Sequence, residues 1–104
     1  MRKLAGESFV FFNRSSAASA HDWIMNLCRQ AGFEPRIAKL ADGPQSILEL
    51  VGAGFGVALV PELFQRFPSD VVFRPLPSAT PKFHLSLVWR RENESQLLKP
   101  VFYS

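Results

Sequence analysis

The sequence has little cysteine and no long apolar run, and each absence excludes a class of protein. Its single cysteine, Cys28, excludes a disulfide within the chain. No apolar stretch reaches the roughly 20 residues that a membrane-spanning helix needs. Near the N-terminus, Glu7 and Ser8 interrupt the apolar residues, where a signal peptide would need an unbroken apolar region. These features favour a reducing, cytoplasmic location.

Concentrated positive charge is also missing. The net charge is +3, and no run of Lys and Arg is longer than two residues. Direct tracking of phosphates needs clustered cations, so we do not expect this segment itself to bind nucleic acid. Hydrophobic residues make up 47% of the 104 residues, and ten of them are Phe, which is typical of one globular domain.

The residues that carry metal or catalytic chemistry are sparse. The two histidines, His21 and His84, are far apart in the sequence and have no partner at a metal-ligand spacing, so no metal site is predicted. The sequence contains no G-x-S-x-G segment to present a nucleophilic serine. Cys28 lies on the apolar face of a predicted helix, where a buried, inert thiol is the expectation. We therefore predict neither an enzyme nor a bound cofactor.

Strand and helix patterns alternate along the chain. Short apolar runs predict buried strands, and apolar residues at helical spacing predict the helices between them. In the last predicted strand, apolar residues alternate with polar ones, which indicates two unequal faces. Such alternation predicts an α/β fold with an open, mostly parallel sheet and helices on both faces. The predicted strands are 8–12, 35–41, 56–60, 70–76 and 82–90, and the predicted helices are 20–33, 45–53 and 61–67.

Local signals predict where the helices begin and end. Ser19 and Asp22 fit a weak capping box at the start of the first helix, and Gly32 fits its end. Gly52, Gly54 and Gly56 form a G-x-G-x-G pattern that follows a helix and precedes a strand. A dinucleotide-binding loop has the reverse order, so a nucleotide site is not predicted. Instead, Gly54 is expected to end the helix, and Gly52 and Gly56 to allow close backbone approach.

Several segments, taken together, resemble one protein family. The segment ILELVGAGFGVALVPELF (47–64) is similar to the L-V-x-x-G-x-G-V-x-L-V-P segment in the effector-binding domain of LysR-type transcriptional regulators. IMNLCRQAGFEPRIA (24–38) resembles that domain's helix-to-strand segment. FRPL (73–76) and LSLVWRRENESQLLKPVF (85–102) resemble its last strands and its C-terminal helix, which here is expected to begin near Ser95. The pieces stand in the family's order.

The resemblance implies one lobe of a periplasmic-binding-protein-like type II fold. It covers the second lobe of the effector-binding domain, at about residues 6–81, and a return strand with a C-terminal helix, at about 82–104. It does not cover the family's first lobe or its N-terminal winged helix-turn-helix. The implied function is sensing of a small-molecule effector (a co-inducer) by a homo-oligomer that contacts DNA through the N-terminal domain. The alternative is a lobe of a solute-binding protein for transport, which shares this architecture.

Two polar segments are candidates for the ligand site. They follow the first and second predicted strands, and ligands of open α/β sheets bind outside the carboxyl ends of strands. The Arg14 guanidinium and the helix starts nearby suit a small anionic effector. The alternative, an ordinary polar loop with an exposed arginine, stays open. The candidate residues are Asn13, Arg14, Ser15 and Ser16 in one segment and Asp42, Gly43, Pro44 and Gln45 in the other.

If this chain forms only one side of a ligand cleft between two lobes, two consequences are expected. This chain by itself should bind an effector only weakly, because the partner lobe's contacts are missing. The return segment should also leave apolar surface exposed, and such patches promote self-association. The residues expected to be covered by a second copy of the chain are Leu85, Leu87 and Trp89, or Leu97, Leu98 and Phe102.

Overall fold

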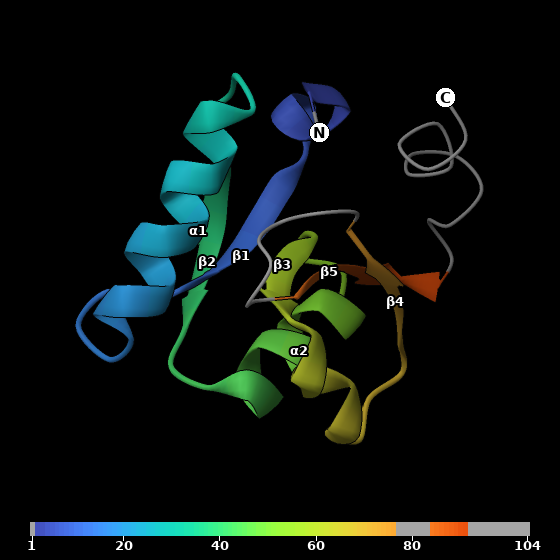
Figure 1. Ribbon diagram of the computed structural model, residues 1–104. Coiled ribbons are helices and arrows are strands. Elements are labelled where there is room, and N and C mark those ends of the chain that lie inside the picture. The colour runs from blue at the N-terminus through green and yellow to red at the C-terminus, as the bar shows by residue number, and fades with distance from the viewer. Residues whose placement is uncertain (1, 77–83, 92–104) are drawn as a thin grey trace.

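The three helices predicted before residue 77 are present, and a further 3-10 helix at residues 2–6 was not predicted. The structure is a computed structural model that describes residues 2–76 and 84–91. Strands and helices alternate along its first part (Figure 1), and α1 and α2 each carry an apolar face that is buried. The α-helices are α1 (Ala18–Gln30) and α2 (Pro44–Gly52), and the 3-10 helices are η1 (Arg2–Gly6) and η2 (Glu62–Arg66).

Three of the strands run in the same direction. β1 pairs with β2 in parallel, and Phe9 of β1 forms a parallel bridge with Val57, immediately before β3. The carboxyl ends of β2, β1 and β3 therefore lie along one edge of the fold. The strands are β1 (Ser8–Phe12), β2 (Arg36–Ala41), β3 (Ala58–Pro61), β4 (Val71–Pro75) and β5 (Leu85–Arg90).

The other strand pairs are antiparallel. β5 lies between β3 and β4 and is antiparallel to both. The described residues thus form a small mixed α/β domain, and the predicted mostly parallel sheet holds only around β1. Residues 76–84, which connect β4 to β5, are too few for the crossover of a dozen or more residues that a parallel neighbour needs.

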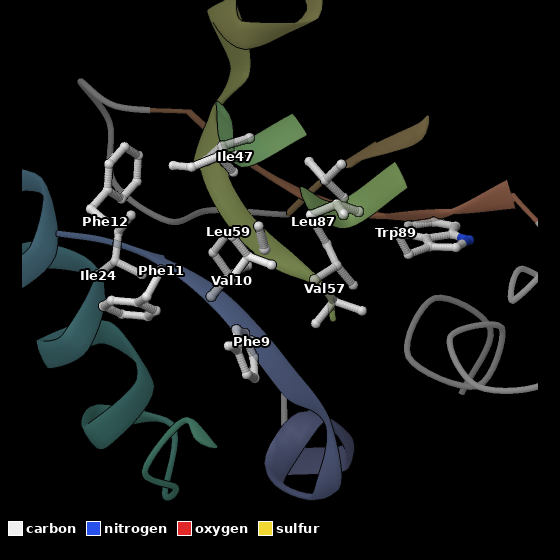
Figure 2. Packing of buried hydrophobic residues seen from close by; sticks show 14 of the residues in the cluster. Phe9, Val10, Phe11, Phe12, Ile24, Ile47, Val57, Leu59, Leu87 and Trp89 are labelled. Atoms are coloured by element: carbon white, nitrogen blue, oxygen red, sulfur yellow. The ribbon is translucent and has the colours of Figure 1, made fainter. Parts of the chain in front are cut away.

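Both faces of β1 are covered, as a strand without polar alternation predicts. Its last four residues, 9–12, are at most 5% exposed. On one face, Phe11 meets the ring of His21 from α1 edge-on, with centroids 5.1 Å apart. On the other face, Phe12 meets Phe64 of η2 with centroids 6.0 Å apart. Figure 2 shows the side chains of Phe11 and Phe12 leaving the β1 ribbon in different directions.

The start of α1 differs from the prediction, whereas its end agrees. Its N-cap is Ala17, which makes no side-chain capping bond, so the predicted Ser19–Asp22 capping box is wrong. The Asp22 carboxylate binds Arg14 instead. At the other end Gly32 has a φ of +98°, a conformation that glycine adopts without a Cβ clash, and it ends the helix as predicted.

The three clustered glycines have different roles. Gly54 has a φ of +93° and ends α2, as predicted. At Gly56 a Cβ atom would lie 2.3 Å from the carbonyl oxygen of Ser8, so the predicted close approach is confirmed there. At Gly52 a Cβ would meet only Val71 Cγ1 at 3.6 Å, an ordinary contact, so the prediction of a required close approach at Gly52 is wrong.

β5 is buried on both faces, contrary to its alternating sequence. Residues 85–89 are all buried, including Ser86; β5 is the central strand of its three-stranded sheet, and α2 packs against it. The predicted exposed surface at Leu85, Leu87 and Trp89 is therefore wrong, since each is at most 1% exposed. The other predicted residues, Leu97, Leu98 and Phe102, and the helix expected near Ser95 lie outside the described residues.

Candidate functional site

The two predicted loops meet at the carboxyl ends of β1 and β2. The backbone N–H of Asn13 donates to the carbonyl oxygen of Ala41 at 2.9 Å. The Ser16 hydroxyl donates to Asp42 Oδ1 at 2.6 Å. We call residues 13–17 and 42–45 the rim. The structure brings both halves of the predicted ligand site together there.

The loop after β1 is shaped by its own side chains. Asn13 Oδ1 accepts hydrogen bonds from the backbone N–H of Ser15 at 3.1 Å and from its hydroxyl at 2.8 Å. The Asn13 carbonyl oxygen accepts from the N–H groups of Ser16 and Ala17 at 3.0 and 2.9 Å. This local network is the usual action of asparagine in turns. The Asn13 side-chain oxygen and the Ser15 hydroxyl therefore hold the loop in shape.

The predicted anion-binding arginine is already engaged. Arg14 donates from Nε and Nη2 to the two carboxylate oxygens of Asp22, each at 3.0 Å. These bonds hold the pKa of the Asp22 carboxyl below its usual range. Both side chains are largely exposed, at 65% and 50%. A ligand carboxylate would therefore have to displace Asp22 in order to use the Arg14 fork.

Two helices begin at the rim without side-chain caps. The N-caps are Ala17 for α1 and Gly43 for α2, and neither makes a side-chain capping bond. Pro44 is the first residue of α2, where its missing N–H is not needed. The side-chain amide of Gln45 donates to the carbonyl oxygen of Pro68 at 3.0 Å, so it is tied to the chain beyond η2. Uncapped helix N-termini favour an anion.

The carboxyl end of a third strand, β3, lies at the same edge and was not predicted as part of the site. Because Val57 is paired with Phe9, Pro61 at the end of β3 is level with Asn13, four residues further along each strand. The same strand-end rule that identified the rim would have found this position. A cavity of about 490 Å³ opens beside η2; its lining residues are Trp23, Pro61, Glu62, Leu63, Gln65, Arg66 and His84.

The surroundings of the two histidines and of Cys28 do not form a metal or thiol site in the described part of the chain. His21 Nδ1 lies 2.9 Å from the carbonyl oxygen of Phe12, and His84 is an exposed residue at the cavity. Cys28 is fully buried, and this burial, with a smaller effect of the nearby Glu34, raises the pKa of its thiol to about 11. Over residues 2–76 and 84–91, no group of three or more His, Cys, Asp or Glu side chains could hold a metal ion.

The helices in the described part of the chain are too short or too polar to cross a membrane.

Comparison with known proteins identifies the family. Residues 1–102 match the model of the LysR substrate binding domain. The chain is 34% identical over 94 residues to the uncharacterized HTH-type transcriptional regulator YwbI of Bacillus subtilis (strain 168), which covers 88% of the chain and 31% of that protein. It is 31% identical over 91 residues to the HTH-type transcriptional regulator BudR of Raoultella terrigena, covering 86% and 31%.

A third relative is the HTH-type transcriptional regulator TtuA of Agrobacterium vitis, which is 42% identical over 75 residues, 71% of the chain and 25% of that protein. The chain thus spans between a quarter and a third of the length of these relatives. All three are named as transcriptional regulators, which supports a regulator's effector-binding domain rather than a solute-binding protein for transport. The chain belongs to the LysR substrate-binding domain family.

Proposed function

We propose that this chain is the second lobe of an effector-binding domain that senses a small molecule for a transcriptional regulator. In this proposal the lobe comprises about residues 6–81 of a periplasmic-binding-like fold, and residues 82–104 return toward the first lobe. The family match supports the function. The observation that carries the site is the hydrogen-bonded contact between the two rim loops, Asn13 N–H to Ala41 O and Ser16 to Asp42.

The effector in this proposal is small and anionic and binds at the rim, between this lobe and the other. Its support is the pair of uncapped helix N-termini rather than Arg14, whose fork Asp22 occupies. A ligand of this kind shifts the equilibrium between open and closed lobes only by its differential affinity for the two states. DNA contact through a separate winged helix-turn-helix, a cytoplasmic location and the absence of catalysis and cofactors belong to the same proposal.

The longer protein offers the direct test of this assignment. Reading the coding DNA in frame upstream of Met1 should show a helix-turn-helix segment and a first lobe. An export signal in that position would favour transport instead. A thermal-shift screen of small organic acids on the 104-residue chain should show little. A ligand at 100 times its Kd would raise stability by about 2.7 kcal/mol, so a strong shift would contradict the half-cleft proposal.

We also propose self-association, but through β2 instead of the return segment. Within the described residues β2 pairs only with β1, and its outer edge is open. Two large apolar side chains on this strand, Ile37 and Leu40, are 40% and 50% exposed. An open strand edge with exposed apolar side chains is a template for pairing with another chain. A second copy of this chain presents the same edge, and the two edges could pair symmetrically.

Light scattering on two matched variants tests this surface. Leu40→Lys places a charge on the open strand and should lower the average mass toward that of a monomer. Leu63→Lys makes the same change at the most exposed large apolar residue of the described chain, on η2, and should leave the mass unchanged. A wild-type monomer at high concentration would contradict self-association, and equal effects of the two variants would contradict the choice of β2.

A further inference from the structure

The lining of the cavity beside η2 combines apolar side chains with charged and polar ones. Its volume of about 490 Å³ lies within the range of small-molecule pockets, roughly 300 to 1,000 Å³. Trp23, Pro61 and Leu63 supply its apolar surface, and Trp23 is half-buried whereas Leu63 is 60% exposed. An exposed leucine beside an indole is surface that an apolar ligand body would cover favourably.

The geometry of η2 places the apolar and the charged groups together. A 3-10 helix has three residues per turn, so residues i and i+3 lie above one another on the same side. Leu63 and Arg66 are related in this way. Glu62 and Arg66 are four residues apart and lie on different sides, and no ion pair joins them within the described part of the chain. Arg66 therefore lies on the same side of η2 as Leu63, and among the described residues no hydrogen bond or ion pair engages its guanidinium.

His84, another residue of the lining, is held to η2 by a backbone hydrogen bond. The N–H of Glu62 donates to the carbonyl oxygen of His84 at 2.8 Å, which holds the residue before β5 against the start of η2. The exposed His84 ring adds a polar group to the lining. The Glu62 carboxylate also lines the cavity, and its negative charge disfavours a ligand with a second anionic group.

We propose that this cavity binds a small monocarboxylate with a planar apolar body. The body would lie against Trp23 and Leu63, and the carboxylate would accept hydrogen bonds from Arg66. This inference deepens the proposed function and rests on it, because it gives the effector site a third segment at the end of β3 and names a ligand class. Unlike Arg14, which is bound to Asp22, Arg66 has no carboxylate partner among residues 2–76 and 84–91 that a ligand would have to displace.

Titration with benzoate, followed by NMR of backbone amides and indole N–H groups, tests the proposal. The chain has two tryptophans, which give an internal control. The Trp23 indole and the amides of 63–66 should shift with benzoate, whereas the indole of Trp89, which is 1% exposed, should not. Benzyl alcohol has the same ring without the charge, and acetate has the charge without the ring. Both should bind more weakly than benzoate.

A charge-matched pair of variants separates recognition from general electrostatics. Arg66→Gln should weaken benzoate binding by about tenfold, the worth of one charge-assisted hydrogen bond, and leave benzyl alcohol unaffected. Arg36→Gln removes the same charge from the start of β2, at the other end of that strand from the rim, and should change neither. An absence of shifts at Trp23, or equal effects of the two variants, would overturn the proposal. Benzoate shifts confined to residues 13–17 would overturn it too, while supporting the rim as the site.

Discussion

The hydroxyl of Ser16 donates a hydrogen bond of 2.6 Å to the carboxylate of Asp42, although the two residues lie 26 positions apart in the sequence. The bond joins the loop after β1 to the loop after β2, and both residues are exposed. An exposed bond of this kind adds little to global stability, because water offers an alternative partner. Its effect should lie in the relative position of the two rim loops.

Ser16→Ala tests this role. We expect the free energy of unfolding to fall by no more than about 1 kcal/mol, with amide shifts in both 13–17 and 42–45 although only one loop was changed. Ser19→Ala, an exposed serine on α1, is the control and should perturb only its own neighbourhood. Shifts restricted to the mutated loop would show that the bond does not couple the loops. Urea unfolding and NMR supply the two measurements.

The glycines at the α2–β3 junction should respond very differently to alanine. In Gly56→Ala the new Cβ would lie 2.3 Å from the backbone oxygen of Ser8, so the pairing of Val57 with β1 must shift. The cost should exceed about 3 kcal/mol, since backbone cannot move aside as a side chain does. In Gly52→Ala the nearest atom is 3.6 Å away and the helix gains roughly 0.5 to 1 kcal/mol. Urea unfolding of both variants compares them, and similar stabilities would contradict this account.

Ser86 carries a buried hydroxyl that we expect not to stabilise the fold. It is fully buried in β5, and among residues 2–76 and 84–91 its Oγ has no hydrogen-bond partner. An unpaired buried polar group costs about 1 to 3 kcal/mol, so removing it should not harm the fold. We expect Ser86→Ala to be neutral or to raise the free energy of unfolding by up to about 1 kcal/mol. A clear loss of stability in urea unfolding would mean that the hydroxyl has a partner after all.

Ser86 also shows where the sequence was insufficient. The alternation of polar and apolar residues around Ser86 predicted a strand with one exposed face, yet both faces of β5 are covered. Alternation reports the polarity of side chains, but burial depends on what packs on each face of the strand, and for β5 this includes α2, which lies more than 30 residues earlier in the sequence. The antiparallel direction of β5 had a local signal, the short connection from β4, which the prediction did not use.

The rim was more predictable than its contacts. The positions of Asn13 and Asp42 after two apolar strands were enough to place both loops at one edge, because parallel strands have their carboxyl ends together. The pairing of Arg14 with Asp22 was not predicted. Arg14 lies in a loop and Asp22 in α1, and the sequence does not give the relative position of these two segments accurately enough to predict a hydrogen bond between their side chains. Likewise, η2 was predicted as a helix, but its cavity depends on packing against Trp23 and His84.

The buried thiol of Cys28 should make the free energy of unfolding fall at alkaline pH. Burial raises the pKa of its thiol in the folded state to about 11, so the unfolded state loses this proton first as the pH rises. The contribution of the buried, protonated thiol to the free energy of unfolding is fully present below the thiol pKa of the unfolded state, which is the lower of the two. It is lost as the pH rises from that value to about 11. The loss approaches roughly 2 to 3 kcal/mol. Urea unfolding across this range should show a steeper decline for the wild type than for Cys28→Ala, and parallel declines would contradict the assignment.

The ion pair between Arg14 and Asp22 should limit anion binding at the rim. Asp22→Asn removes the carboxylate that occupies the guanidinium fork, and the freed Arg14 then offers paired N–H donors beside the start of α1. We expect acetate or phosphate to shift the amides of 13–17 at several-fold lower concentration than in the wild type. The pKa of Asp22 is lowered by this pair, so in the wild type the interaction persists above the usual aspartate pKa and is lost as the pH falls through the lowered value. The wild-type rim should therefore bind phosphate more tightly at a pH below that lowered value, whereas acetate is itself protonated there and does not serve as the probe in acid.

Glu34→Gln is the matched control for this variant. Glu34 pairs with Arg29 at the far end of α1, so the substitution frees one arginine and changes the net charge equally, but away from the rim. If the gain in anion binding comes from the freed Arg14, Glu34→Gln should leave the rim amides unchanged, because exposed charges more than about 10 Å apart are largely screened at moderate salt. Equal gains in the two variants would assign the effect to net charge. Unchanged binding in Asp22→Asn would remove Arg14 from the ligand site and leave the two uncapped helix N-termini as the groups that attract an anion there.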